Sequence, residues 1–266
     1  MKGQIGIYNK NKNLIYFSSN KNSNTSIVFI SGMYGGLFEP GYTKEIYKMC
    51  RKKQINFFQP RLSSFPNFGL FTLENDALEV LESLKYNQSE NIILIGHSTG
   101  CQVIMYLIEN YGEDFKERVK ICILHGPISD RNYEEHVNRD LPKIIKEVTN
   151  KSESEVFVYE NTMYKKERFL DLYRIGGKDD FFSYDLENTF FENLNKIEFK
   201  ILFIISGNDK FTKESNLNKL KLIKGGEVKI IKEADHFLKQ KKYIKKFLNI
   251  ITKKISRLEK NNLSNL

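Results

Sequence analysis

The sequence predicts an α/β fold in which a mostly parallel central sheet is covered by helices on both faces. The first sign is a set of short apolar runs rich in β-branched residues, such as Ser26–Ser31 and Val119–His125, which are typical of buried strands. The second is that segments of helical periodicity, such as Leu73–Leu84, alternate with these runs, as expected of parallel strands joined by helices. The third is the length of 266 residues, which suits one such domain with a full core.

The N-terminal half follows this alternation after an initial edge hairpin, which the polar turn Asn9–Asn13 predicts. Thr72 is placed to cap the helix that begins at Leu73. The expected strands are residues 4–8, 13–18, Ser26–Ser31, Ile55–Gln59, Ile92–Ile95 and Val119–His125, and the expected helices are Tyr42–Lys53, Leu73–Leu84 and a segment containing Val103–Ile108.

The alternation stops between residues 127 and 198, where polar, charged and aromatic residues mix. We expect one domain over residues 1–266, with residues 127–198 inserted as a helical cap over the site; extra surface helices are the alternative. Helical periodicity recurs inside the insertion at Leu141–Val148 and Phe169–Tyr173. Its aromatic residues suit either an apolar substrate wall or the insertion's own core, and we favour the core.

The sheet is expected to resume after the insertion. Lys200–Ser206 and Glu227–Lys232 are the last predicted strands, and Tyr243–Leu258 is the closing helix. One face of this helix is apolar and the other carries lysines, so it can dock on the core or touch an anionic membrane surface. We favour docking on the core.

The clearest local motif is Gly96-His97-Ser98-Thr99-Gly100, which stands between a predicted strand and a predicted helix. A G-x-S-x-G sequence in this setting is typical of a nucleophile elbow, in which a tight turn presents a serine hydroxyl, and it predicts an α/β-hydrolase fold. The alternative is a glycine-rich turn of a nucleotide-binding fold. A phosphate loop, however, would have more glycines or a G-K-[ST] ending.

A serine nucleophile needs a base, and the base needs an acid that orients it. Ser98, Asp209 and His236 occur in the chain order expected of this fold, and each follows a predicted strand. Asp130, which follows the strand after the elbow, is the rival acid, and we favour Asp209. Asp235 is expected to point away from the site.

Two further features concern the same site. Of the other histidines, we expect His97 to be structural, His125 to border the pocket and His136 to lie in the cap. The glycine-rich bend Gly32–Gly36 follows the strand at Ser26–Ser31, where this fold supplies an oxyanion donor. The backbone N–H groups of Met33 and Thr99 are the candidates; a flexible loop before a helix is the alternative.

Composition limits the partners. The formal net charge of +9 comes from lysines spread along the chain, without an arginine-rich block or a basic stripe with aromatic residues, so we expect no nucleic-acid partner. An odd number of cysteines in apolar surroundings indicates free thiols of a reducing compartment, so we expect a cytoplasmic protein. The N-terminus has no apolar signal-peptide core, and no apolar run reaches the length of a membrane span. The spacings typical of metal sites and dinucleotide sites are missing, so we expect no metal and no cofactor.

Four segments carry a more specific signal: GHSTGCQ (Gly96–Gln102), GPISDR (Gly126–Arg131), KDDFFSYDL (Lys178–Leu186) and a spaced pattern between Leu62 and Asp76. Together they resemble the signature blocks of an α/β-hydrolase family, formerly of unknown function, that includes fungal siderophore hydrolases acting on fusarinine-type esters. The resemblance implies a serine esterase with the triad Ser98, Asp209 and His236. It further implies a cap framework, with ion pairs, that involves Asp130, Arg131, Asp179 and Asp180.

The expected activity is therefore hydrolysis of a small-molecule carboxylic ester through an acyl-enzyme intermediate. A thioesterase, a lipase-like enzyme or an acyltransferase would use the same three side chains. A hydrolase-fold protein that binds a ligand without turnover is the alternative from another class.

Overall fold

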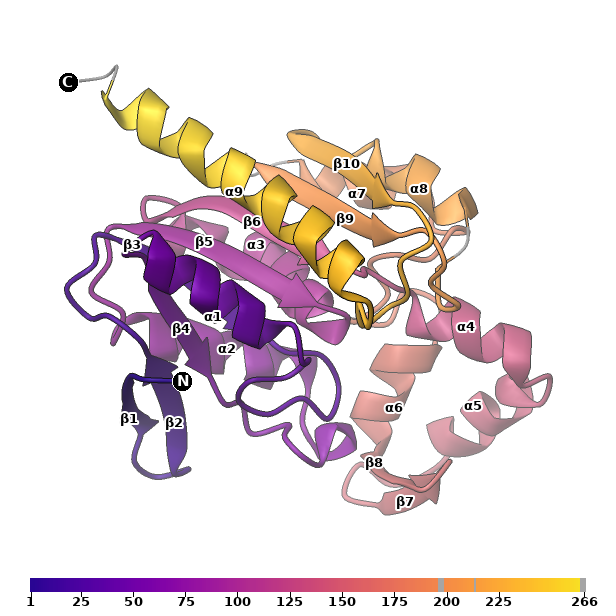
Figure 1. The fold of residues 1–266 in the computed structure, drawn as a ribbon. Coiled ribbons are helices and arrows are strands. Elements are labelled where there is room, and N and C mark those ends of the chain that lie inside the picture. Colours follow the sequence, from indigo (N-terminus) through magenta and orange to yellow (C-terminus); the bar gives the residue numbers. More distant parts are fainter. Residues whose placement is uncertain (196–198, 213, 264–266) are drawn as a thin grey trace.

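The structure is a computed structural model, and it describes residues 1–195, 199–212 and 214–263. An eight-stranded sheet forms its centre, in the order β1-β2-β4-β3-β5-β6-β9-β10 (Figure 1). The strands of this sheet are β1 (Gln4–Asn9), β2 (Leu14–Ser18), β3 (Thr25–Ile30), β4 (Asn56–Pro60), β5 (Asn91–His97), β6 (Val119–His125), β9 (Ile201–Ser206) and β10 (Gly226–Ile231).

The sheet is parallel except at its N-terminal edge. β1 and β2 pair antiparallel, as do β2 and β4, whereas every pairing from β4 across to β10 is parallel. β5 lies between β3 and β6, so the elbow serine leaves the sheet near its middle. The predicted fold class is confirmed, and each predicted strand has a counterpart within two residues at either end.

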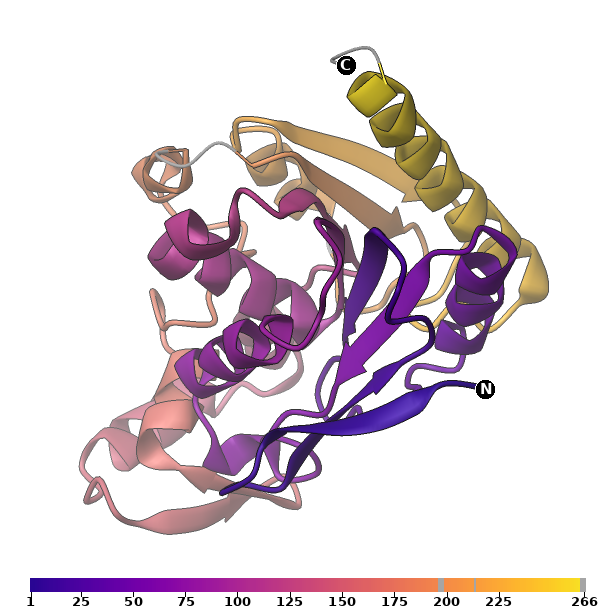
Figure 2. The ribbon, with the colours of Figure 1, turned by 90° about the vertical axis from the view of Figure 1, so that its left-hand side faces the viewer.

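Helices cover both faces of the sheet (Figure 2). On one face, α1 (Thr43–Lys52) and α9 (Lys241–Leu263) pack over Ile93 and Ile95, while on the other, α2 (Leu73–Leu84) and α3 (Thr99–Phe115) pack over Ile92 and Leu94. This alternation along β5 follows from the two-residue period of a strand. The remaining helices are η1 (Phe68–Leu70), α4 (Asp130–Val137), α5 (Leu141–Thr149), α6 (Lys166–Tyr173), α7 (Asn188–Leu194) and α8 (Glu214–Leu220). Within the described ranges, no helix combines the length and the apolar character needed to cross a membrane.

Residues 127–195 contain more helices and strands than apolar periodicity predicted. Residues 196–198 of the expected cap lie outside the described residues. Between α5 and α6 the chain forms a two-stranded hairpin, β7 (Val156–Tyr159) and β8 (Thr162–Lys165), whose turn residues Glu160 and Asn161 both have positive φ. The segment α4 to α6 lies beyond the C-terminal ends of β5 and β9 (Figure 1). Apolar periodicity did not predict α4 or the hairpin, because α4 has few apolar residues and the strands of the hairpin are short.

The aromatic residues of this segment pack into cores. Four of them, Tyr159, Tyr164, Phe169 and Tyr173, belong to a local cluster with Phe68 of η1. Phe181, Phe182, Phe190 and Phe191 join the core on the α2–α3 face. The packing supports the favoured interpretation of these aromatics as core residues.

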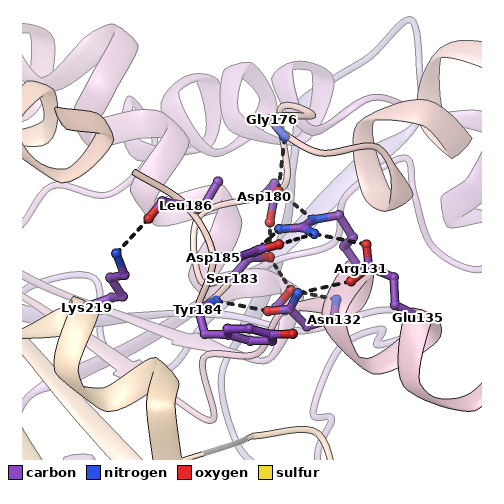
Figure 3. Close-up of polar contacts among 11 residues, drawn as sticks. Arg131, Asn132, Glu135, Gly176, Asp180, Ser183, Tyr184, Asp185, Leu186 and Lys219 are labelled. Atoms are coloured by element: carbon purple, nitrogen blue, oxygen red, sulfur yellow. Dashed lines mark hydrogen bonds and ion pairs between the residues drawn. The ribbon is translucent and has the colours of Figure 1, made fainter. Parts of the chain in front are cut away.

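Buried ion pairs hold α4 against the chain that follows α6 (Figure 3). Arg131 Nε donates to Asp180 Oδ2 at 2.8 Å, and its Nη1 donates to Asp185 Oδ2 at 3.0 Å. The neighbouring Asn132 Oδ1 accepts a hydrogen bond from the Tyr184 backbone N–H at 3.0 Å. Arg131 is 1% exposed, so its guanidinium needs these partners to remain buried.

Replacement of Phe247 by alanine should destabilise the protein by about 3–5 kcal/mol. Phe247 of α9 is fully buried, with its ring centroid 5.2 Å from Tyr42 and 4.8 Å from His125. Urea denaturation measures the change in unfolding free energy. The exposed Lys253 on the same helix is the matched control, and Lys253→Ala should change stability by less than about 0.5 kcal/mol. Equal effects of the two substitutions would contradict the docking of α9 through this face.

Candidate active site

Ser98 occupies a strained turn between β5 and α3. Its backbone has φ 55° and ψ −125°, a region that residues with a Cβ rarely adopt. The turn is held by the Ser98 backbone N–H, which donates to the His125 carbonyl at 3.0 Å. The side chain therefore projects from the point where a central strand enters a helix, as the G-x-S-x-G motif predicted.

The two motif glycines allow this turn. A Cβ on Gly96 would lie 2.4 Å from the Gly100 carbonyl oxygen, and a Cβ on Gly100 would lie 2.5 Å from the Ile30 carbonyl oxygen. Any larger residue at either position would force backbone atoms apart. The first turn of α3 thus lies directly against the end of β3.

His236 and Asp209 come together across the ends of β9 and β10. His236 Nδ1 donates to Asp209 Oδ2 at 2.6 Å, and Asp209 Oδ1 accepts the backbone N–H of Phe211 at 3.0 Å. With the Nδ1 proton held by the carboxylate, Nε2 of His236 is the nitrogen left to accept a proton. The rings of Phe211 and Phe237 pack on this imidazole, with centroids 5.1 and 4.9 Å away.

The other two histidines near the site are buried beneath it. His97 packs on His236 with ring centroids 4.7 Å apart, and its Nδ1 lies 3.3 Å from Nδ1 of His125. His125 lies 2.7 Å from the Tyr42 hydroxyl, which donates to its Nδ1. Burial lowers the pKa of His125 to about 3 and holds the pKa of His97 well below its usual range. Both rings are therefore neutral near pH 7.

The remaining candidates make other contacts. Asp130, the rival acid, accepts a hydrogen bond from Gln102 Nε2 at 2.8 Å, and burial raises its pKa to about 7. The Asp235 carboxylate accepts hydrogen bonds from the backbone N–H groups of Phe237 and Lys239, so it stabilises the turn that follows it. His136 is exposed on α4.

The loop after β3 approaches Ser98 closely. A Cβ on Gly32 would lie 2.7 Å from Ser98 Cβ. The Met33 backbone N–H donates to Thr99 Oγ1 at 3.3 Å, so this donor already lies beside the elbow. Thr99 is the first residue of α3, and helix geometry offers its own N–H no intrahelical acceptor. The two predicted donors thus stand on the loop and on the helix that flank Ser98.

A cavity of about 740 Å³ contains Ser98 and His236 in its lining. This size is within the usual range for small-molecule sites. Its walls are mainly apolar and come from three places: the loop at Gly32–Gly35, the start of α1 at Tyr42, and residues after β9 and β10, including Phe211, Phe237 and Leu238. Of residues 127–195, only Ile128 and Asp130 border it.

These wall residues were not predicted from the sequence. The one available signal was their position, since Phe211 and Phe237 stand within two residues of Asp209 and His236. No group of three or more His, Cys, Asp or Glu side chains in the described part of the chain is arranged to hold a metal ion.

Comparisons with known proteins agree with this architecture. A family model described as "Protein of unknown function (DUF1749)" matches residues 1–258. Fusarinine C esterase sidJ of Aspergillus fumigatus is 26% identical over 132 residues, which are 40% of this chain and 37% of that protein. The match therefore spans little more than a third of the length of the esterase.

Solved structures share the fold over nearly the whole chain. Siderophore hydrolase EstB from Aspergillus fumigatus superposes with a TM-score of 0.75 at 20% identity, covering 97% of this chain and 98% of that one. Alpha/beta hydrolase domain-containing protein 10 from mouse gives a TM-score of 0.69 at 14% identity, covering 96% and 99%. The α/β-hydrolase fold expected from the elbow motif is thereby confirmed.

His97 and His125 should remain uncharged across the range in which an exposed histidine titrates. Burial lowers the pKa of both rings below the ordinary histidine value of about 6.5. In the folded protein, neither neutral ring should therefore take up a second proton between pH 8 and about pH 5. NMR chemical shifts of the two imidazoles, assigned with His97→Asn and His125→Asn variants, report this directly. A protonation midpoint above pH 6 at His125 would contradict the buried, neutral assignment.

Proposed function

The chain belongs to the DUF1749 family of proteins of unknown function, and we propose that this member is a serine hydrolase of carboxylic esters. The observation that carries the proposal is the 2.6 Å hydrogen bond from His236 to Asp209, because His236 and Ser98 line the same cavity. Hydrolase activity of the α/β-hydrolase type is supported by the match to a fusarinine C esterase and by the fold shared with a siderophore hydrolase.

The three side chains have complementary roles in this proposal. Nε2 of His236 takes the proton of the Ser98 hydroxyl as its oxygen attacks the ester carbonyl. Asp209 keeps the imidazole in the required tautomer and stabilises the imidazolium that forms. His236 then gives the proton to the leaving alcohol, which leaves an acyl group on Ser98. Water activated by the same histidine releases the acid. His97 and His125 bond to each other beneath the site, whereas His236 bonds to a carboxylate, and these contacts support His236 as the base.

The negative oxygen of the tetrahedral intermediate would be held by the backbone N–H groups of Met33 and Thr99. One donor of this kind is typically worth about 3 kcal/mol of barrier. In the resting structure the Met33 N–H donates to Thr99 Oγ1. When the oxyanion forms, it accepts the hydrogen bond of the Met33 N–H in place of Thr99 Oγ1 or together with it. The positive end of the α3 dipole adds to this stabilisation.

The shape of the cavity favours a small or medium ester with apolar parts, because its walls are mainly apolar and its volume is about 740 Å³. Residues 127–198 act as a cap in this proposal, with Ile128 and Asp130 as its points of contact with the cavity. Fusarinine-type esters are the first specific substrates to test, given the names of two of the similar proteins.

A fluorophosphonate probe should label the purified protein at Ser98. The reagent reacts with an activated serine hydroxyl, so labelling should disappear in Ser98→Ala and in His236→Ala. Mass spectrometry of the labelled peptide identifies the site. A well-folded protein that takes up no label would instead favour a hydrolase-fold binding protein. For a labelled protein, matched ester and thioester substrates then separate an esterase from a thioesterase.

Asp209→Asn should lower kcat for an activated ester by up to about 10⁴-fold, because asparagine cannot stabilise the imidazolium and favours the wrong tautomer. Asp130→Asn is the comparison variant, since Asp130 is the rival acid but bonds to Gln102. Its loss should stay below about tenfold. Steady-state kinetics with p-nitrophenyl esters measures both. The assignment fails if Asp130→Asn is the more damaging of the two.

A further inference from the structure

A second, much smaller cavity lies behind the loop that carries Met33. It has a volume of about 20 Å³ and is enclosed by five parts of the chain. The loop after β3 contributes Met33, the 60–70 loop contributes Ser64, α2 and α3 contribute Asp76 and Thr99, and α6 of the insertion contributes Arg168. This cavity is separate from the one that contains Ser98 in its lining.

Two charged side chains in its wall have unsatisfied atoms. Asp76 is 4% exposed and Arg168 is 1% exposed. Arg168 Nη1 donates to Asp179 at 2.5 Å, but Arg168 Nε and Asp76 Oδ1 have no hydrogen-bond partner within the described part of the chain. A buried donor or acceptor without a partner is costly, so each such group calls for a ligand that satisfies it.

We propose that this cavity is a binding site for an internal water molecule that joins Asp76, Arg168 and Thr99. Water is the ligand that suits a wall with one free donor and one free acceptor, because it both accepts and donates. An anion would be repelled by Asp76, and a cation by Arg168. The volume fits the one or two molecules for which a site of this size has room.

The water connects the insertion to the loop that carries Met33. Thr99 Oγ1 accepts the Met33 N–H, so its own hydroxyl proton is available to the water. The water then accepts from Arg168 Nε and Thr99 and donates to Asp76 Oδ1. A chain of hydrogen bonds therefore runs from α6 through the water and Thr99 to the Met33 N–H.

This chain makes Asp76 and Arg168 positioning residues for the oxyanion donor, a role that rests on the proposed esterase function. Neither side chain borders the cavity beside Ser98. Burial raises the pKa of Asp76 to about 7, yet its Oδ1 can accept from water in either protonation state. Since the oxyanion exists only after attack, losing the water should lower kcat and leave KM unchanged.

The first test is a high-resolution crystal structure of the unmodified protein. We expect density for an ordered water within hydrogen-bond distance of Asp76 Oδ1 and Arg168 Nε. A dry cavity, or a chloride or sodium ion in it, would overturn the proposal. This readout does not depend on catalytic activity.

The second test compares three variants in p-nitrophenyl butyrate hydrolysis. Asp76→Leu removes the acceptor at similar volume and should lower kcat about tenfold or more, with KM within twofold. Asp76→Asn keeps an oxygen for the water and should stay within about threefold of the wild type. Asp171→Leu is the matched control: Asp171 is also buried with an unpartnered oxygen, but it does not border the cavity. It should leave kcat unchanged.

The outcomes separate the two proposals. A loss of kcat in Asp76→Leu without one in Asp171→Leu supports the positioning role. Equal losses of kcat in Asp76→Leu and Asp171→Leu overturn it, and so do equal losses in Asp76→Leu and Asp76→Asn. If Asp76→Leu does not fold, a crystal structure of Thr99→Val replaces it: loss of the ordered water supports its hydrogen bond to Thr99, and an unchanged water overturns that bond. A wild type that neither labels nor turns over esters would refute the esterase function and with it the positioning role. The crystal density would still decide the water site.

Discussion

The close approach of α3 to the end of β3 is the constraint on which the site depends. Because Gly100 has no side chain, the first turn of α3 can lie against the Ile30 carbonyl. Because Gly96 has none, the end of β5 can lie against the backbone of that first turn. Ser98 must then take a positive φ, which points its side chain out of the sheet. The same contact brings the loop at Met33 beside Thr99. The same packing contact therefore fixes the strand, the candidate nucleophile Ser98 and the candidate oxyanion donors.

The three histidines of this region differ in their surroundings. His97 and His125 lie in the floor, where desolvation keeps them neutral and lets them pack like aromatic rings against Tyr42 and Phe247. His236 lies above them with a carboxylate on Nδ1. Identical side chains thus differ in environment, because one has a charged partner and the others do not. The neutral floor avoids a second positive charge next to the imidazolium that the proposed reaction creates.

Buried ion pairs hold the parts of the insertion to one another. Arg131 and Arg168 each pair with an aspartate of the same short segment, Asp180 and Asp179. Removing one member of such a pair would leave a buried charge, so these contacts specify one arrangement of the insertion. They also explain why apolar periodicity did not predict α4. The position of this helix depends on its arginine, Arg131, and on the side chain of Ser129, which caps it.

The sequence alone determined the order of the strands of the central sheet, the elbow and the positions of Ser98, Asp209 and His236 just after strands. It could do so because apolar period reveals buried elements, and parallel strands bring their C-terminal ends to one edge. Only the tertiary structure decided that His236 bonds to Asp209 while Asp130 bonds to Gln102, and that the walls of the cavity come from residues such as Phe211. Those choices depend on distances between residues far apart in the chain, which no local pattern of side chains encodes.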